Sequence, residues 1–222
     1  MPKYYTDEYD SCVIDFETLS ITPWSCAVLD VGAVLFKRSE MNHKFKDLCD
    51  NGFHMKFDVT HQVTENHRCI DPDTLAWWEK QTDGAKQILL PSASDKQLIE
   101  FTKAFEDWLN SNSIDLYKMR LYARGSSFDI TILRSIYHIV YGDSYDKMLP
   151  FRYWRERDIR TAIEEIVDDQ IQKIPVPCFE LAGFIKHNSI HDCAKDVMAM
   201  SYARKIACGY FDINNIDDCV LC

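Results

Sequence analysis

Cys12-Val13-Ile14-Asp15-Phe16-Glu17-Thr18 is the stretch that decides the fold. It reads as an apolar strand that carries two carboxylates one residue apart. Side chains alternate across a strand, so Asp15 and Glu17 project from one face while Ile14 and Phe16 anchor the other. Two carboxylates held this close raise each other's pKa unless a cation lies between them. The stretch therefore predicts a site for a hard divalent cation or, as the alternative, the wet face of an edge strand.

Two later segments supply groups of the same chemical kind. Arg124-Gly125-Ser126-Ser127-Phe128-Asp129 leads into the apolar run Ile130-Thr131-Ile132-Leu133. Ser189-Ile190-His191-Asp192-Cys193-Ala194-Lys195-Asp196 follows much later. Neither segment is decisive alone, but their order and separation favour one site built from three parts of the chain.

The three segments resemble the motifs of the DEDD 3′→5′ exonucleases, in the DEDDh subgroup where a histidine precedes the last aspartate by five residues. The resemblance implies an α/β fold of the ribonuclease H-like type, a mixed sheet flanked by helices. It also implies hydrolysis of phosphodiester bonds with two Mg²⁺ ions, for which Mn²⁺ substitutes. The matching residues are Asp15 and Glu17, then Asp129, then His191 and Asp196.

Within this family the chain is similar to the exonuclease A type of T-even bacteriophages. The similarity runs from about Val13 to Gly209 and includes Thr74-Leu75-Ala76-Trp77-Trp78 and Arg157-Asp158-Ile159-Arg160-Thr161. It implies release of nucleoside 5′-monophosphates from the 3′ ends of single-stranded DNA, in the host cytoplasm if the protein is phage-encoded. A bacterial group with similar motifs acts on RNA, so an exoribonuclease is the first alternative. A nucleic-acid-binding module without activity is the second, although all five catalytic positions hold the expected residue types.

The resemblance also assigns a role to each catalytic residue. Asp15 bridges both ions, Glu17 and Asp196 complete the site on the side of the nucleophile, and Asp129 supports the second ion. His191 takes the proton from the attacking water, and its ordinary pKa of about 6.5 suits that role near neutrality. Five residues along a helix turn through about 500°, so His191 and Asp196 cannot share a helix face. We therefore expect His191 on a loop, with Asp192 as the N-cap of the last helix.

Six residues are expected to contact substrate: Thr18, Leu19, Trp77, Trp78, Ser126 and Arg160. Thr18 and Leu19 follow the first motif, where family members touch the terminal nucleotide. Trp77 and Trp78 point about 100° apart on a helix, so one faces substrate at most and the other packs in the core. Ser126 holds a phosphate or Asp129, with a plain turn as the alternative. Arg160 belongs to an arginine-rich segment that either contacts phosphates or forms salt bridges on the surface.

Length and composition predict one domain. With 222 residues and 46% hydrophobic content, the chain can bury one core, and we expect a single domain over 1–222 with flexible ends at 1–10 and 210–222. No signal peptide and no apolar run of about 20 residues is present, which predicts no membrane association. The net charge of −10 predicts weak, distributive binding to nucleic acid. Cys219 and Cys222 form a C-x-x-C pair that we expect in a flexible tail rather than at a zinc ion.

Periodicity and breakers predict the elements. We expect strands at 12–18, 27–36, 54–59 and 120–124, and helices after Asp71-Pro72, close to Asp129, over 160–168 and from Asp192 to about Cys208. We also expect a capping box at Ser94-Asp95-Lys96-Gln97 before the helix that carries Leu98 to Leu109, and a break at Pro175-Val176-Pro177.

Overall fold

A five-stranded mixed sheet forms the centre of the protein, seen in a computed structural model that describes residues 8–167, 174–212 and 219–221. The strand order is β3-β2-β1-β4-β5. The strands are β1 (Ser11–Thr18), β2 (Val28–Phe36), β3 (Phe53–Lys56), β4 (Arg120–Ala123) and β5 (Glu156–Asp158). β2 pairs antiparallel with β1 and β3, whereas β4 pairs parallel with β1 and β5. The first two predicted strands are confirmed, and the third ends early because Val59–Thr64 is helical.

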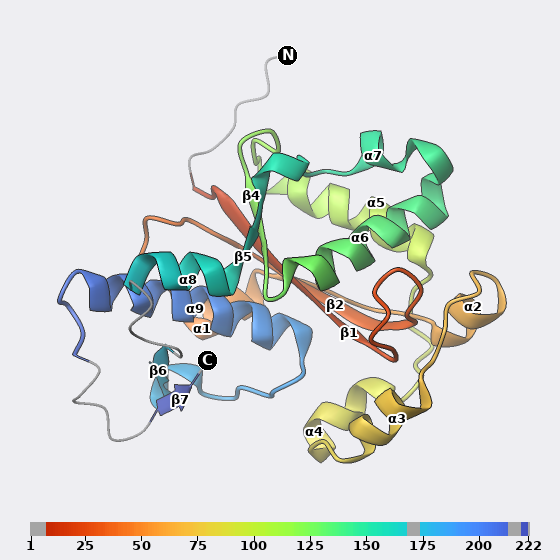
Figure 1. The fold of residues 1–222 in the computed structure, drawn as a ribbon, viewed down its shortest axis with the longest axis horizontal. Coiled ribbons are helices and arrows are strands. Elements are labelled where there is room, and N and C mark those ends of the chain that lie inside the picture. The colour runs from red at the N-terminus through yellow and green to blue at the C-terminus, as the bar shows by residue number, and fades with distance from the viewer. Residues whose placement is uncertain (1–7, 168–173, 213–218, 222) are drawn as a thin grey trace.

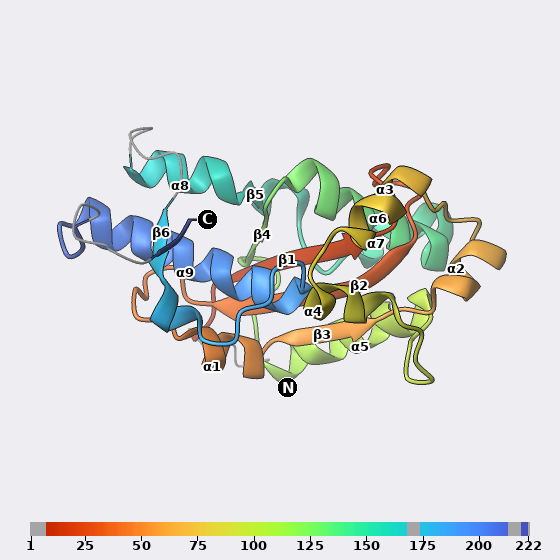
Figure 2. The same cartoon turned by 90° about the horizontal axis from the view of Figure 1, so that it is seen from below.

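Helices cover both faces of the sheet (Figures 1 and 2). The helices are α1 (Phe45–Asp50), α2 (Val59–Thr64), α3 (Pro72–Glu79), α4 (Asp83–Lys86), α5 (Leu98–Ser111), α6 (Ser126–Tyr141), α7 (Tyr145–Met148), α8 (Ile159–Val167) and α9 (Ser189–Ala207). Short 3-10 turns lie at Gln87–Leu89, Gly142–Ser144, Tyr153–Arg155 and Cys178–Leu181. In the part of the chain that the structure describes, no helix is both long and apolar enough to cross a membrane.

The alternation along β1 divides the core into two layers. Ile14 and Phe16 pack with α5 and α6 on one face of the sheet, where the rings of Phe16 and Phe101 lie 6.2 Å apart. Val13 faces the other way and packs with α8 and α9. Asp15 and Glu17 have the same parity as Val13, so they lie on the α9 face, where β1 approaches its carboxyl end.

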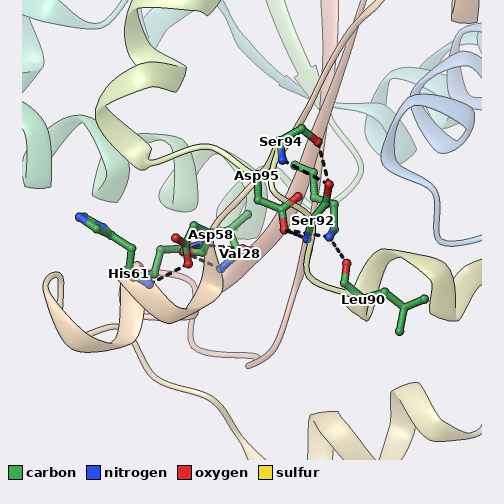
Figure 3. A network of polar contacts seen from close by, with 9 residues as sticks. Val28, Asp58, His61, Leu90, Ser92, Ser94 and Asp95 are labelled. Atoms are coloured by element: carbon green, nitrogen blue, oxygen red, sulfur yellow. Dashed lines mark hydrogen bonds and ion pairs between the residues drawn. The ribbon is translucent and has the colours of Figure 1, made fainter.

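The helix that follows β3 has a side-chain cap. Asp58 caps α2 by accepting a hydrogen bond from the backbone N–H of His61 at 2.9 Å (Figure 3).

The capping box predicted at Ser94-Asp95-Lys96-Gln97 lies elsewhere in the structure. Ser94 and Asp95 belong to a separate loop network, in which the Asp95 carboxylate accepts from the Ser92 N–H at 2.8 Å and pairs with Lys56. The box lies three residues later, where Gln97 caps α5 and its N–H donates to the Glu100 carboxylate at 2.8 Å. Ion pairing with Lys56 therefore holds Asp95 in the loop.

A second correction concerns the start of α9. Asn188, not Asp192, is the N-cap, and its side-chain oxygen accepts from the backbone N–H of His191 at 3.2 Å. His191 therefore lies in the first turn of the helix rather than on the incoming loop. The end of the helix at Ala207, with Cys208 as C-cap, agrees with the prediction.

The helix α8 ends before Pro175, in agreement with the predicted break. Pro175–Pro177 forms the short strand β6, which pairs antiparallel with β7 (Cys219–Leu221). The flexible end expected at 210–222 stays a prediction. Cys222 and the side chain of Cys219 lie outside the described part, so the zinc alternative stays a prediction. Seven cysteines are described, and all are free thiols.

Gly32 determines how closely α9 approaches the sheet. It lies in β2 directly opposite Asp15, and a Cβ atom built on it would lie only 2.4 Å from the Ser189 carbonyl carbon and the Ile190 nitrogen. The thiol of Cys193 also donates to the Gly32 carbonyl at 3.3 Å. A side chain at this position would force the helix away from β1.

We therefore expect Gly32→Ala to lower the free energy of unfolding by about 1–3 kcal/mol and to reduce activity, because overpacking displaces the helix that carries Asp196. Gly84→Ala is the matched control, since its Cβ would meet Ile185 at an ordinary 3.6 Å. Urea titration and rate measurements on both variants test this. Equal stability of the two variants would contradict the close approach.

Candidate active site

Asp15 and Glu17 form the base of a carboxylate cluster at the centre of the sheet. Burial raises the pKa of Asp15 well above its ordinary range, and the charges of Asp129, Glu17, Asp192 and Asp196 raise it further. Burial also raises the pKa of Glu17 to about 7, partly offset by a hydrogen bond and an opposite charge from His187. Asp15 and Glu17, which the sequence pattern singled out, are thus two acidic groups held close together in a buried part of the protein.

The start of α6 brings Asp129 to the same cluster. Gly125 adopts a left-handed conformation with φ of +98°, which turns the chain from β4 into the helix. Asp129 is 3% exposed, and its carboxylate accepts from the backbone N–H of Phe16 at 3.1 Å. Burial raises the pKa of Asp129 to about 8 despite that hydrogen bond. The second sequence motif therefore reaches β1 from the neighbouring parallel strand.

Asp196 comes from α9 and is the one carboxylate of the four with a strong cationic partner. It is 4% exposed, and its Oδ1 accepts from Arg124 Nε at 2.8 Å and lies 2.6 Å from Arg124 Nη2. Burial raises the pKa of Asp196, and the Arg124 charge works against that rise. Arg124 belongs to the quoted sequence motif without an assigned role, and its position directly after the buried part of β4 is the signal that could have suggested one.

The donor set of this cluster fits divalent metal ions. Four carboxylates converge where burial penalises each of their charges, and one arginine opposes them. Such an arrangement is stable in its ionised form only when cations neutralise it. Oxygen-only ligands of this kind are those that Mg²⁺ and Mn²⁺ prefer.

His191 does not join the carboxylates in this structure. Its Nδ1 accepts from the backbone N–H of Ile185 at 3.0 Å, and its ring packs 5.3 Å from Phe45 and 6.4 Å from Phe184. Burial lowers its pKa. Because α9 begins before His191, the rotation of about 500° between His191 and Asp196 separates their directions, as the helix geometry requires. The side chain therefore lines a cavity of about 630 Å³ beside α1.

His187 occupies the position where His191 was expected. Its Nδ1 lies 3.6 Å from Glu17 Oε1, and its backbone N–H donates to Asp192 Oδ2 at 2.8 Å. Glu17, His187 and Asp192 together could hold a metal ion, because their ligand atoms lie within 4.8 Å of one another. The sequence analysis missed His187 as a site residue and treated Asp192 only as a cap. A second histidine four residues before His191 was the available signal.

A cavity of about 390 Å³ opens beside Glu17. Thr18, Trp77 and Phe128 line it, and Trp77 is 41% exposed with its ring 4.8 Å from that of His187. Trp78 is buried, and its indole N–H donates to the Thr18 carbonyl at 2.9 Å. Trp78 is therefore the tryptophan that packs in the core, and contact of Trp77 with substrate stays a prediction.

Leu19 lies elsewhere. It is 4% exposed and packs with Leu29 and Trp78 in a small apolar cluster behind the strand end. The structure does not bring its side chain to the cavity beside Glu17, so the expected substrate contact of Leu19 is not supported. Its backbone follows Thr18 and accepts from the Asp71 N–H at 2.7 Å.

Asp158 organises the loop that holds Ser126 and Arg160. Its Oδ2 accepts from the N–H groups of Gly125 and Ser126 at 2.9 and 3.1 Å, and its Oδ1 accepts from Arg160 and Thr161. Burial raises the pKa of Asp158, but these four hydrogen bonds outweigh burial and hold it below its ordinary value. Arg160 is exposed and its guanidinium lies over Gly125. Ser126 thus serves the turn, and Arg160 lies near the second motif.

Comparison with known proteins agrees with this architecture. A family model described as the 3′-5′ exoribonuclease Rv2179c-like domain matches residues 10–204. The exodeoxyribonuclease of Enterobacteria phage T4 is 35% identical over an alignment of 217 residues, which covers 93% of this chain and 94% of the phage protein.

Solved structures share the fold at low identity. *E. coli* exonuclease I in complex with a dA16 oligonucleotide matches with a TM-score of 0.53 and 11% identity over 88% of this chain. The chain spans only 40% of exonuclease I. Cell-death related nuclease 4 matches with a TM-score of 0.53 and 13% identity over 92% of this chain and 67% of that one. The predicted ribonuclease H-like fold is confirmed.

Proposed function

The chain belongs to the family of Rv2179c-like 3′-5′ exoribonuclease domains, and we propose that within it this protein hydrolyses single-stranded DNA to nucleoside 5′-monophosphates. Exonuclease action on nucleic acid in the 3′-5′ direction follows from the family and from the phage relative. The observation that carries the proposal is the cluster of Asp15, Glu17, Asp129 and Asp196 beside an open cavity. The preference for DNA rests on 35% identity to an exodeoxyribonuclease along nearly the whole chain.

We propose that the four carboxylates hold two Mg²⁺ ions, with Mn²⁺ as a substitute. Bound there, the metal would supply an activated water and neutralise the charge that develops on the phosphate and the leaving oxygen. Asp15 lies among the other three carboxylates, whose charges raise its pKa, and it would contribute to both ion sites. Glu17 and Asp196 would complete one ion site, and Asp129 would support the other.

The chain's own residues would orient the strand end. Trp77 presents an exposed ring on which a terminal base can stack, a contact worth about 1–3 kcal/mol. Thr18 lines the same cavity, and Arg160 is free to approach a phosphate from the side of the second motif. Unpaired ends reach such a recessed centre without the cost of breaking stacked base pairs.

A histidine is proposed to take the proton from the attacking water. His191 holds the sequence position that the DEDDh pattern assigns to this base. Its Nδ1 accepts from the Ile185 N–H, and this hydrogen bond must break before the ring can turn toward the carboxylates. His187 is the second candidate, because it already lies beside Glu17. Glu17 beside His187, or Asp192 acting on His191, would stabilise the imidazolium that forms.

The alternative function is an exoribonuclease that uses the same centre, and the matching family is described as a 3′-5′ exoribonuclease domain. The two differ in a contact to the 2′-OH. Matched single-stranded DNA and RNA oligonucleotides with a 5′ label distinguish them. We expect the DNA to shorten faster and from its 3′ end, in a distributive ladder, and a 3′-phosphate to block it. Faster loss of the RNA would establish the alternative function, and immediate release of the labelled 5′ nucleotide would refute the polarity.

A further inference from the structure

A third cavity, of about 330 Å³, lies at the end of the sheet where β1 begins, away from the carboxylates. Four arginines line it: Arg38, Arg120, Arg157 and Arg204. They come from the segment after β2, the first residue of β4, the middle of β5 and the last turn of α9. Residues distant in sequence therefore gather four positive charges around one hollow.

The described acidic groups do not balance these charges. Asp10 lies 3.5 Å from Arg120, accepts from the Arg38 backbone N–H at 2.8 Å and raises the pKa of Arg204, and Glu165 is the acidic residue among those that line the cavity. These two carboxylates face four arginines. Among the described residues, no ion pair joins a carboxylate to Arg38, Arg157 or Arg204. Such clustering is unexpected in a protein with a net charge of −10.

Arg204 shows the effect of this crowding. Burial lowers its pKa and the positive charge of Arg38 lowers it further, whereas Tyr122 and Asp10 raise it. Tyr122 is 3% exposed and lines the same cavity, so part of the cavity wall is closed to water. Like charges held together in a partly enclosed hollow cost free energy unless an anion binds between them.

Ordinary structural roles explain the arginines one at a time. Arg204 lies in the last turn of α9, where a cation interacts favourably with the helix dipole. Arg157 donates to the carbonyls of Trp154 and Glu156 at 3.0 and 2.7 Å. Neither role accounts for Arg38, whose charge lowers the pKa of Arg204. The convergence of the four is what requires a separate explanation.

We propose that this cavity binds a phosphate group, carried by a free nucleoside monophosphate or by a nucleic-acid strand. Guanidinium groups match phosphate oxygens with paired hydrogen bonds and remain charged at all working pH values. Arg204 follows Asp196 by eight residues, about 12 Å along α9, so one helix connects the phosphate site with the carboxylate cluster.

Binding to the metal-free protein tests the proposal separately from hydrolysis. In EDTA the carboxylate cluster holds no metal and repels anions. Phosphate therefore does not bind at the carboxylates, and any binding that is measured occurs elsewhere. Calorimetry measures the affinity for inorganic phosphate, for thymidine monophosphate and for a single-stranded oligonucleotide. Chloride at equal ionic strength is the control for non-specific anion binding. We expect Arg204→Gln and Arg38→Gln each to lose at least tenfold in affinity. Arg152→Gln is the control, because Arg152 is exposed near the Tyr117 ring and lies outside the cavity.

Thermal unfolding supplies the second readout. Without phosphate, the Arg204→Gln and Arg38→Gln variants should melt at or above the wild-type temperature, because repulsion is relieved; with phosphate, only the wild type and the control should gain stability. Binding of the mononucleotide identifies a free nucleotide as the ligand, and binding of the oligonucleotide alone identifies the strand. No response beyond chloride in the wild type, or unchanged affinity in both cavity variants, would overturn the proposal and leave the carboxylate centre unaffected.

Discussion

Asp15→Ala is expected to abolish hydrolysis while the protein stays folded. The Asp15 side chain lies among Glu17, Asp129 and Asp196, so its removal deletes the oxygen donor that the proposed ions would share. In EDTA the same change should raise the melting temperature, because fewer like charges are held together in a buried place. The effect should be clearest above pH 8, where Asp129, with its pKa of about 8, is ionised. Rate assays in Mg²⁺ and melting curves in EDTA measure the two effects.

Two further variants make this result specific. Asp15→Asn keeps the volume of the side chain and should reproduce both effects. Asp146→Asn, on the exposed surface of α7, should change neither the rate nor the stability without metal. Near-native turnover of Asp15→Ala in Mg²⁺ would refute the assignment of the whole centre.

His191→Ala is expected to lower the rate by about 10²–10⁴-fold, the usual contribution of a general base, while substrate binding is largely kept. His187→Ala should have a smaller effect on the rate, about tenfold or less, and should instead weaken the binding of metal and strand end. The reason is that His187 contacts Glu17 and the exposed Trp77 rather than holding the position of the family's base. Single-turnover rates and substrate titrations of the two variants separate these effects.

The reverse result would exchange the two roles. A loss of 10²-fold or more in His187→Ala, with near-normal His191→Ala, would make His187 the base and His191 a residue of the neighbouring cavity. Unchanged rates in both variants would remove histidine from the mechanism.

The carboxylates could be predicted from sequence because their signals are local. Asp15 and Glu17 share a face of any strand, and the turn at Gly125 fixes where Asp129 begins its helix. The orientation of His191 could not be predicted in the same way. Asn188 and Asp192 are both good N-caps, and the choice between them depends on contacts of α9 with Gly32, which is distant in sequence. The rotation between His191 and Asp196 is the same with either cap, but with Asn188 as the cap His191 lies inside the helix.

Contacts between distant segments account for the other differences. Trp77 and Trp78 separate as their helix spacing predicts, whereas Leu19 turns into an apolar cluster with Leu29 of β2, Trp78 of α3 and Ala85 of α4. Four arginines spread from Arg38 to Arg204 carry no common pattern, and only the fold brings them together. Asp95 likewise has the sequence context of a helix cap, but in the structure it forms an ion pair with Lys56.

The number of divalent ions that the carboxylate centre holds is the most direct test of the account. Calorimetric titration with Mn²⁺, in the presence of a single-stranded oligonucleotide whose terminal linkage resists hydrolysis, counts them. The account predicts two ions for each wild-type chain and loss of that binding in Asp15→Asn, with Asp146→Asn unchanged. Fewer than two ions in the wild type, or two ions bound with equal affinity by Asp15→Asn, would contradict it.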